Sequence, residues 1–229
     1  MKRALSLVAM FGIALSPLLA ENPAAQKPAT PNAFSEGGGV NGNVLAIAVL
    51  PDGGVIVGGV FSSVCGVARR NIAKLNADGT LDRTAFEGPT SGVNGKIAAL
   101  AVSPDGGVVA GGEFSDASGQ PRSNLAKFRL DGSLDPSFSA SGTTNGPVAA
   151  VSIQPDGRIL VGGEFTQVGG QPRKNLARLM SDGTLDPAIG GTAGVTGAVR
   201  AVAASGALRA IAGGSFQVAS TGNRGLFRE

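Results

Sequence analysis

The chain of 229 residues contains 37 Gly, 13 Pro, 10 Phe and one Cys, and it has no His, Trp or Tyr. Without histidine, the sequence excludes Ser-His-Asp and Cys-His catalysis and histidine-based zinc sites, so any enzymatic chemistry would depend on carboxylate, Lys or Arg side chains. A content of 15% charged and 42% hydrophobic residues is typical of a chain that buries a core, and neither of a disordered tail nor of a membrane bundle.

The N-terminus has the three regions of a secretory signal peptide. Lys2 and Arg3 precede an apolar run over residues 4–15, and a short segment after it ends at Ala20, where cleavage is expected. The alternative is an anchoring helix, but the run is shorter than the ~20 residues that a membrane span needs. We therefore expect a signal peptide over residues 1–20, an Ala- and Pro-rich linker over residues 21–31, and a secreted or periplasmic mature chain without a membrane span.

Removal of the signal peptide changes the charge balance. Loss of Lys2 and Arg3 from the 19 basic residues leaves 17 against 16 acidic residues, a net charge of +1. A nearly neutral surface with few aromatic side chains lacks the features that bind nucleic acid. We expect no nucleic-acid partner, and the sequence predicts no cofactor and no metal site.

A repeat of about 51 residues fills the rest of the chain. Pro51-Asp52-Gly53 returns at residues 104–106 and 155–157, with residues 204–206 as a degenerate fourth copy. A Gly-Gly-x-Phe element recurs at spacings of 53, 51 and 51 residues and ends at Phe61, Phe114, Phe165 and Phe216. A large apolar side chain at one place in every unit is what a shared core requires, so these Phe residues are predicted to be structural.

Each unit is predicted to contain four β-strands. In the first unit, residues 44–50 and 54–60 are rich in Val, Ile and Ala and are joined by the Pro-Asp-Gly turn, which predicts a hairpin. A third strand is expected near residues 70–76 and a weaker fourth near residues 81–86, after an Asp-Gly turn. Four strands per ~50 residues are typical of a propeller blade.

The predicted fold is therefore an all-β propeller with repeats at approximately residues 40–91, 92–143, 144–194 and 195–229. The fourth repeat stops before its fourth strand, whereas residues 32–37 look like a spare fourth strand. We expect a four-bladed ring in which this N-terminal strand closes the last blade. The alternative is that the chain is part of a longer array of repeats. Any whole number of repeats that starts and stops at these points of the repeat would have the same spare strand at one end and the same missing strand at the other.

The first strand of each unit has one face of small residues and one of larger ones. In the first unit, Ala46 and Ala48 alternate with Ile47. We expect the small residues to crowd the propeller axis and the larger ones to pack against the neighbouring blade.

The recurring phrases resemble a known repeat family. QPDGRILVGGEF (residues 154–165), GGQPRKNLARL (residues 169–179) and SDGTLDP (residues 181–187) are similar to the delta-60 repeat, a bacterial β-propeller family of uncharacterised function. The resemblance covers about residues 32–229, in three good copies and one degraded copy. It implies a secreted propeller and no particular activity, because the family has no established catalytic residues.

Four charged residues that do not recur in every blade are the candidate ligand-binding residues. Lys96 and Arg200 are expected on or next to innermost strands, and Glu113 and Glu164 stand where the other two blades have Val and Ser. Two interpretations are open: side chains at a channel mouth, where propellers often bind ligands, or solvated strand ends.

The repeated carboxylates Asp82, Asp135 and Asp186 are predicted to be structural. We expect each to form a charge pair or hydrogen-bond clamp, with Arg70, Arg122 and Arg173 as partners, because residues present in every unit usually serve what every unit shares. The alternative is a ring of charge that holds a polar or anionic ligand. Cys65 is predicted to be a small buried residue, with a reactive thiol or a covalent dimer link as the alternatives.

The predicted function is that of a secreted, non-catalytic interaction or structural module, which presents variable loops on a rigid ring to an unknown protein or glycan partner at the cell surface. The alternative is a carbohydrate-active propeller enzyme with paired carboxylates, for which Glu113 and Glu164 are the candidates. Such an enzyme would need the two groups about 5–10 Å apart in one pocket.

Overall fold

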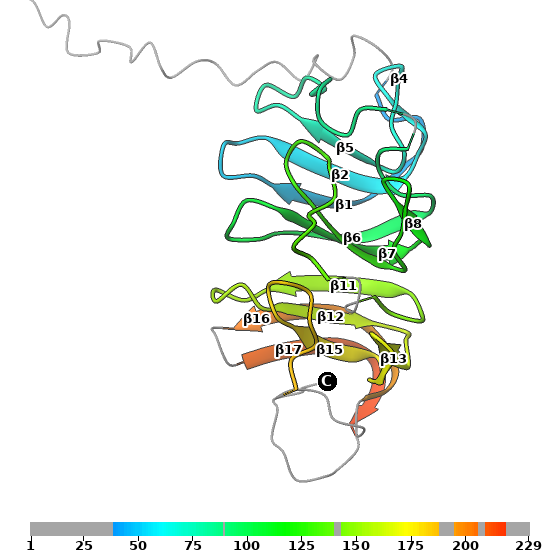
Figure 1. Ribbon diagram of the computed structural model, residues 1–229, viewed down its shortest axis with the longest axis vertical. Helices are drawn as coiled ribbons and strands as arrows, with labels where there is room; N and C mark the ends of the chain where they lie inside the picture. The colour runs from blue at the N-terminus through cyan, green and yellow to red at the C-terminus, as the bar shows by residue number, and fades with distance from the viewer. Residues whose placement is uncertain (1–38, 89, 140–142, 188–194, 206–208, 219–229) are drawn as a thin grey trace, which may run out of the picture.

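The described part of the chain is built from β-strands alone, with no helix among its residues. The computed structural model describes residues 39–88, 90–139, 143–187, 195–205 and 209–218 (Figure 1). The predicted signal peptide, the linker and the strand expected at residues 32–37 lie outside these residues, and so does the end of the fourth repeat.

Three sheets repeat one order of strands. In the first sheet, β2 (Val55–Val60) lies between β1 (Asn43–Val49) and β5 (Ile72–Leu75), and all pairings are antiparallel. This confirms the predicted hairpin and third strand to within two residues. The same order holds in the sheet of β6 (Lys96–Val102), β7 (Val108–Glu113) and β10 (Leu125–Phe128), and in that of β11 (Val148–Ile153), β12 (Ile159–Gly163) and β15 (Leu176–Leu179).

The fourth copy is a long hairpin of β16 (Val195–Ser205) and β17 (Arg209–Val218). In this hairpin Ser205 lies opposite Arg209, as Gln154 lies opposite Arg158 in the third copy. The turn therefore falls after residue 205, and Ala204 and Ser205 belong to the strand. The predicted equivalence of residues 204–206 with Pro-Asp-Gly is wrong by two residues.

In the first three blades the fourth strand is much shorter than expected. It is reduced to single bridges between Leu75 and Leu81, Phe128 and Leu134, and Leu179 and Leu185. The chain leaves the sheet at once because the next carboxylate closes a turn: Asp82 Oδ1 accepts hydrogen bonds from the backbone N–H groups of Thr84 and Ala85. The prediction of four full strands is therefore corrected to three strands and one bridged residue.

A two-residue hairpin follows the second strand of each of the first three blades. The hairpins are formed by β3 (Ser63–Val64) with β4 (Val67–Ala68), β8 (Asp116–Ala117) with β9 (Gln120–Pro121), and β13 (Gln167–Val168) with β14 (Gln171–Pro172). Cys65 takes the first turn position with φ of 49°, and Ser118 takes the same position with φ of 48°. Cys65 is partly buried and packs against the core of the first blade, so the prediction of a buried residue is confirmed only in part. The reason is that a two-residue turn projects from the sheet edge.

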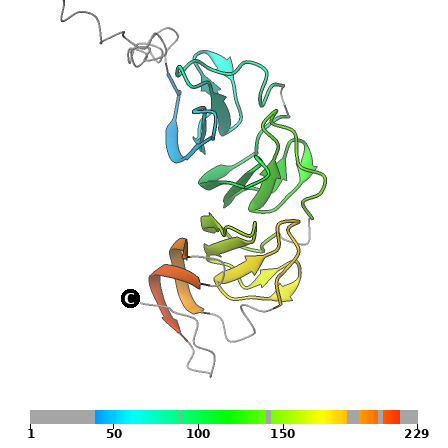
Figure 2. The same ribbon diagram turned by 90° about the vertical axis from the view of Figure 1, so that its left-hand side faces the viewer.

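The sheets stack face to face in a curved row, with the first blade and the last hairpin at opposite ends (Figures 1 and 2). Ala46 and Ala48 of β1 lie in one core cluster with Ile97 and Leu100 of the second blade. The small face of β1 thus packs against the following blade, and the face of β6 with the larger residues packs against the preceding blade. The expectation that the small residues crowd the axis is wrong, because the strands turn their edges rather than their faces to the concave side.

A glycine in the second strand lets adjacent sheets approach closely. A Cβ atom on Gly58 would lie 2.6 Å from Ile97 Cγ2, and one on Gly111 would lie 2.5 Å from Val148 Cγ1. Any side chain there would push the next blade away. The first glycine of each Gly-Gly pair therefore sets the spacing between blades, whereas the second lies against the first strand of its own sheet.

Phenylalanine side chains fill the cores. Phe61, Phe114 and Phe165 are 5%, 6% and 1% exposed, and Phe216 is half-buried. A second set joins one blade to the next: the Phe86 backbone N–H donates to Asp131 O at 3.2 Å, and its ring lies 5.5 Å from that of Phe128 in an edge-to-face arrangement. Phe86 thus extends from the end of the first blade into the second.

Candidate functional site

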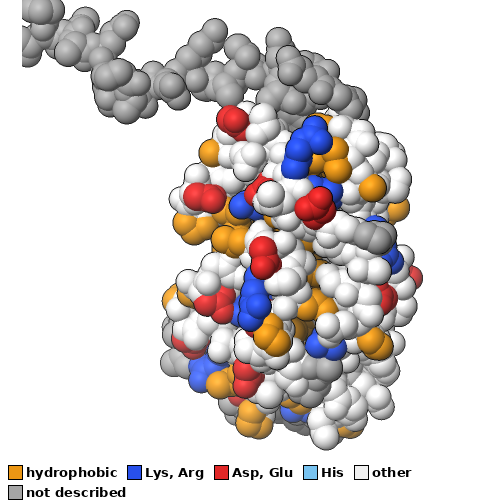
Figure 3. All heavy atoms as spheres, turned by 45° about the horizontal axis from the view of Figure 1, so that its top comes forward, with side chains coloured by type: hydrophobic (Ala, Val, Ile, Leu, Met, Phe, Trp, Pro, Cys, Tyr) orange, Lys and Arg blue, Asp and Glu red, His pale blue; other side chains and the backbone are white. Residues whose placement is uncertain are grey.

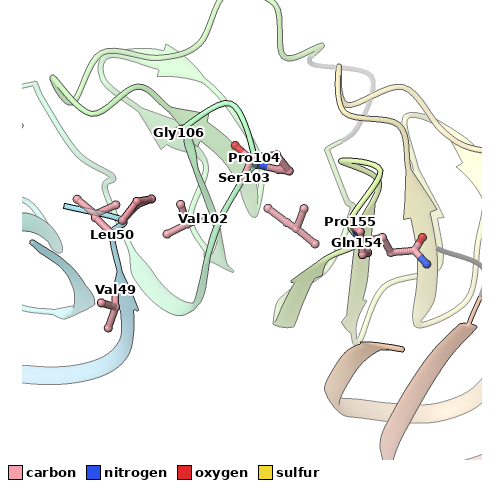
Figure 4. Close-up of a pocket in the computed structure, with 10 residues that line it drawn as sticks. Val49, Leu50, Val102, Ser103, Pro104, Gly106, Gln154 and Pro155 are labelled. Atoms are coloured by element: carbon pink, nitrogen blue, oxygen red, sulfur yellow. The ribbon is translucent and has the colours of Figure 1, made fainter. Parts of the chain in front are cut away.

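An apolar groove crosses the ends of three blades, at the side where their first hairpins turn (Figure 4). Its volume is about 500 Å³. Each blade contributes the last residue of its first strand and the next two residues, and no charged side chain lines the groove. These residues are Val49, Leu50 and Pro51, then Val102, Ser103 and Pro104, then Ile153, Gln154 and Pro155.

The Pro-Asp-Gly turns hold the groove residues in place. In the first blade, the Gly53 N–H donates to Leu50 O at 3.0 Å, and Gly53 has φ of 83°, which favours glycine. The Asp52 carboxylate accepts from the backbone N–H of Gly54 at 2.8 Å. The same turn therefore places the same residues at the same end of three blades.

A smaller pocket of about 300 Å³ lies beside the groove, between the second and third turns. It shares Ser103, Pro104 and Pro155 with the groove. Unlike the groove it is charged, because Asp105, Lys127 and Asp156 line it.

Lys127 is a buried cation held between two carboxylates. Its side chain is only 3% exposed, and its Nζ atom forms ion pairs with Asp105 and, at 3.2 Å, with Asp135. Burial of an ammonium group is expensive unless partners surround it, and here both partners come from turns of the same blade. The arrangement ties the Pro-Asp-Gly turn to the end of the third strand.

The other blades carry related pairs at the same positions. Lys74 Nζ lies 3.1 Å from Asp82 Oδ2, and Arg178 Nε lies 2.8 Å from Asp186 Oδ2. In the third blade Arg158 joins the pair, with its Nε atom 3.5 Å from Asp186 Oδ2. Each of these blades thus has one basic residue on its third strand and one carboxylate just after it.

These contacts lower the pKa values of the carboxylates. Partial burial by itself raises the pKa of Asp105, but hydrogen bonds from Lys127, Ser103 and the Gly107 N–H outweigh it and lower the pKa to about 2. For Asp82, burial is likewise outweighed by hydrogen bonds from Thr84, Ala85 and Lys74, and its pKa lies below its usual range. These groups stay ionised at neutral pH and keep their ion pairs.

We expect the protein to lose stability as the pH falls from about 4 to about 2. The folded-state pKa values of Asp82, Asp105 and Asp135 lie below the ordinary value of 3.8, so the unfolded chain binds more protons in this range. Their contribution is present above the unfolded pKa and is lost as the pH falls through the folded values. Thermal melts followed by circular dichroism between pH 2 and 7 measure it. Asp105→Asn should flatten the profile, and a melting temperature that stays constant down to pH 2 contradicts the prediction.

The expected partners of the repeated carboxylates are corrected by the structure. Asp82, Asp135 and Asp186 pair with the third-strand residues Lys74, Lys127 and Arg178, and not with Arg70, Arg122 and Arg173. Arg122 and Arg173 precede the third strand, and their guanidinium groups donate to the adjacent carbonyl groups of Pro121 and Pro172.

The first-blade equivalent of these two arginines is Arg69 rather than Arg70, because it too lies two residues before the asparagine that precedes the third strand, Asn71. Arg69 is 3% exposed, and its Nη2 atom donates to the carbonyl oxygens of Asp82 and Arg83. It therefore contacts the backbone of the carboxylate residue and leaves the side chain to Lys74. Arg70 Nη1 instead lies 3.8 Å from Asp116 of the next blade.

The four candidate ligand-binding residues lie away from the groove. Lys96 and Glu113 are opposite each other at the far ends of β6 and β7, and both are exposed. Glu164 has the equivalent place after β12, and Arg200 is exposed next to the bulge of β16. Since β7 begins at the turn and ends at Glu113, roughly 17 Å of strand separates this carboxylate from the groove. None of the four lines either pocket, so the structure brings Lys96 and Glu113 together but does not add them to the groove.

Two recurring asparagines fix the ends of the blades, and the sequence analysis missed them; the first of them joins one blade to the next. Asn71 has φ of 65°, accepts from the Phe61 N–H through Oδ1, and donates to Val93 O of the next blade through Nδ2. Asn124 repeats these contacts with Phe114 and Thr144.

The second asparagine lies in the connector before each blade. Asn94 Oδ1 accepts from the backbone N–H groups of Ser115 and Asp116, and Asn145 does the same in the third blade. The signal was present in the sequence, because both asparagines recur at the repeat spacing. Their roles follow only from the left-handed backbone and from contacts between segments about 20 residues apart.

The charges on the face seen in Figure 3 are mixed in sign. On the face seen in Figure 3, acidic and basic side chains are interspersed, with hydrophobic side chains between them. Among the residues that the structure describes, no group of three or more carboxylate or thiol side chains is placed to hold a metal ion. In the same part of the chain, no helix has the length and apolar character needed to cross a membrane.

Comparison with known proteins supports the fold. Residues 50–84, 103–138 and 154–188 match the sequence profile of a family described as a domain of unknown function (DUF5122) beta-propeller. The chain therefore carries three copies of a β-propeller repeat, one in each three-stranded blade. No curated protein matches the chain.

Two solved structures are similar to parts of the chain. One is a structural genomics protein of unknown function from Bacteroides thetaiotaomicron, with 14% identity and a TM-score of 0.45 over 78% of this chain and 45% of that one. The other is a putative oxidoreductase (glucose dehydrogenase) from Thermus thermophilus, with 22% identity and a TM-score of 0.36 over 66% of this chain and 48% of that one. The chain thus spans less than half the length of either protein.

Proposed function

We propose that this chain is a secreted, non-catalytic β-propeller of the delta-60 type that binds an extended apolar segment of another protein. The propeller repeat is supported by the three matched segments and by the sheets. The delta-60 type rests on the recurring phrases at residues 154–187, and secretion rests on the signal-peptide pattern of residues 1–20.

The groove at the hairpin turns is the observation that carries the binding role. Three successive blades contribute equivalent residues to it, so an extended segment that crosses the blades would meet Val49, Val102 and Ile153 in turn. The lining is apolar and uncharged, which suits Leu, Ile, Val or Pro side chains of a partner and not a sugar or a phosphate. The rigid turns pre-organise this surface, which lowers the entropic cost of binding.

The candidate carboxylates of an enzyme are not in this groove. Glu113 and Glu164 are exposed at the opposite ends of their strands. A glycosidase needs its two carboxyl groups on either side of one bound sugar, in one pocket. The groove therefore supports binding in preference to hydrolysis.

A peptide selection tests this function. Peptides selected from a random phage library on the wild-type chain should be rich in apolar residues and should bind at least about tenfold more weakly to Pro155→Glu, which places a charge in the groove at an exposed turn position. Glu164→Gln, at the opposite end of β12, is the matched control and should leave binding unchanged. Peptide binding that is insensitive to Pro155→Glu contradicts the proposal. So does hydrolysis of aryl glycosides that is lost in Glu113→Gln or Glu164→Gln.

A further inference from the structure

The inner strand at one end of the row presents an apolar face that none of the described residues covers. We call this the leading face of β1; its residues are Val44, Ile47 and Val49, which are 38%, 63% and 68% exposed. Large apolar side chains this exposed, side by side on one strand, mark a surface that a partner covers.

The hairpin at the other end presents a complementary face, which within the described part of the chain is also uncovered. We call this the trailing face of β16–β17, and it consists of Ala201, Ala203, Ile211 and Gly213. Ile211 is 49% exposed, and both alanines are exposed. Neither the leading nor the trailing face carries a charged residue, so covering them costs no desolvation of charge.

These two kinds of face already meet three times within the chain. In each case two apolar side chains from the inner strand of one blade pack against a glycine in the second strand of the preceding blade. A Cβ atom on Gly58 would lie 2.6 Å from Ile97 and 3.1 Å from Leu100. A Cβ atom on Gly162 would likewise lie 2.5 Å from Val199 and 2.9 Å from Val202. At Gly213, by contrast, the nearest atom among the described residues is Ala201 Cβ at 3.8 Å, so no described side chain fills the equivalent space.

At equivalent positions in the other blades, the side chains are buried by a neighbouring blade. Ile211 occupies the position of Ile56, Val109 and Leu160 in the other blades, and those three residues are 0% exposed. Ile47 occupies the position of Leu100, Val151 and Val202, which are half-buried against a preceding blade. The two faces are therefore the separated halves of the interface that joins the blades.

We propose that a second copy of this chain covers both faces. The leading face of each copy packs on the trailing face of the other, and two copies of four blades form one eight-bladed ring. Eight blades lie within the usual range of propellers, and an interface between unlike faces closes when the rotation of the parts completes a circle. The chain is an open arc (Figure 2), and three packed interfaces fix its curvature, so bringing its own ends together would require those interfaces to open.

A disulfide designed on the internal interfaces provides the test. The Cβ position of Gly58 lies 3.2 Å from Ile97 Cβ, and that of Gly162 lies 3.3 Å from Val199 Cβ, close to the spacing that a disulfide needs. The matching pair at the free faces is Val44 and Gly213. We would make Val44→Cys with Gly213→Cys in a Cys65→Ser background of the 229-residue chain, since Ser118 already occupies the equivalent turn position.

The expected product of mild oxidation is a covalent dimer on a non-reducing gel. Each single-cysteine variant alone should stay monomeric on that gel, whereas an equal mixture of the two single variants should give a dimer, because only unlike faces meet. A disulfide within one chain would overturn the proposal, since it means that the chain closes its own ring. Dimers from either single variant, a ladder of longer polymers, or no cross-link at all would also overturn it.

The oligomeric state of uncrosslinked protein gives a second measurement. By light scattering, the wild-type chain should have twice the mass of one copy, and Ile47→Glu should have the mass of one. Val60→Glu is the matched control: Val60 is 48% exposed, lies outside the leading face, and stands where the next two blades carry Glu113 and Glu164. It should remain a dimer, and all variants should keep the wild-type circular dichroism spectrum. A monomeric wild-type chain, or a dimer unaffected by Ile47→Glu, contradicts the proposal.

Discussion

Replacing Phe86 with alanine is expected to lower the free energy of unfolding by about 3–5 kcal/mol. The side chain is 1% exposed and joins two blades, because it extends from the first blade to the Phe128 ring and to the turn at Asp131 of the second. Its removal would leave a cavity at an interface where the backbone cannot collapse, since Gly132 already lies against the Phe86 backbone. The edge-to-face contact with Phe128 would be lost as well.

Guanidinium denaturation followed by circular dichroism would measure this effect as a lower midpoint. Arg83→Ala, at an exposed position three residues earlier, is the control and should change stability by no more than about 0.5 kcal/mol. Because the stability of a repeat protein is a sum over units and interfaces, hydrogen exchange should increase most at the first and second blades. A loss below about 1 kcal/mol for Phe86→Ala would mean that Phe86 does not join the blades as described.

Replacing Lys127 with methionine is expected to cost about 3–5 kcal/mol, although methionine fills a similar volume. The loss arises because the Asp135 side chain, 13% exposed, would keep its charge without its buried partner. Lys127→Arg should retain most of the stability, since Arg178 pairs with Asp186 at the equivalent position of the third blade. The same denaturation experiment at pH 7 measures both variants.

A double variant separates the lost charge pair from lost packing. If the uncompensated carboxylate causes the loss, Lys127→Met with Asp135→Asn should recover part of the stability lost in Lys127→Met alone. No recovery in the double variant would assign the effect to packing of the lysine stem instead. Asp105 is a weaker partner in this test, because its side chain is 57% exposed and water screens its charge.

The proposed assembly gives the groove a larger context. The groove follows the hairpin turns on three blades, and Val49 at its end belongs to the leading face. In a ring of two copies the grooves of both chains would line one mouth of a common channel. The two proposals remain separable, because Pro155→Glu alters the groove far from the leading face, whereas Ile47→Glu alters that face without lining the groove.

Local patterns were sufficient for the hairpins, the third strands and the repeat. Pro-Asp-Gly between two runs rich in Val and Ile specifies a hairpin through neighbours in sequence, and the structure places β1 and β2 within one residue of the expectation. The columns of Phe residues indicated a core shared by all units, and Phe61, Phe114 and Phe165 are buried. Such features depend on backbone preferences and on side chains a few residues apart, which a single sequence displays.

Contacts between distant segments decided the ion-pair partners, the groove and the curvature of the row of blades. The length and spacing of the repeats do not reveal which faces of the sheets meet. Asp82 could pair with any nearby cation, and only the direction of the third strand selects Lys74 over Arg70. The groove joins turns about 50 residues apart, and no one repeat contains it. The openness of the arc likewise depends on the angle at which each blade packs on the next, which the glycine at Gly58 and the side chains of Ile97 and Leu100 set through close packing in three dimensions.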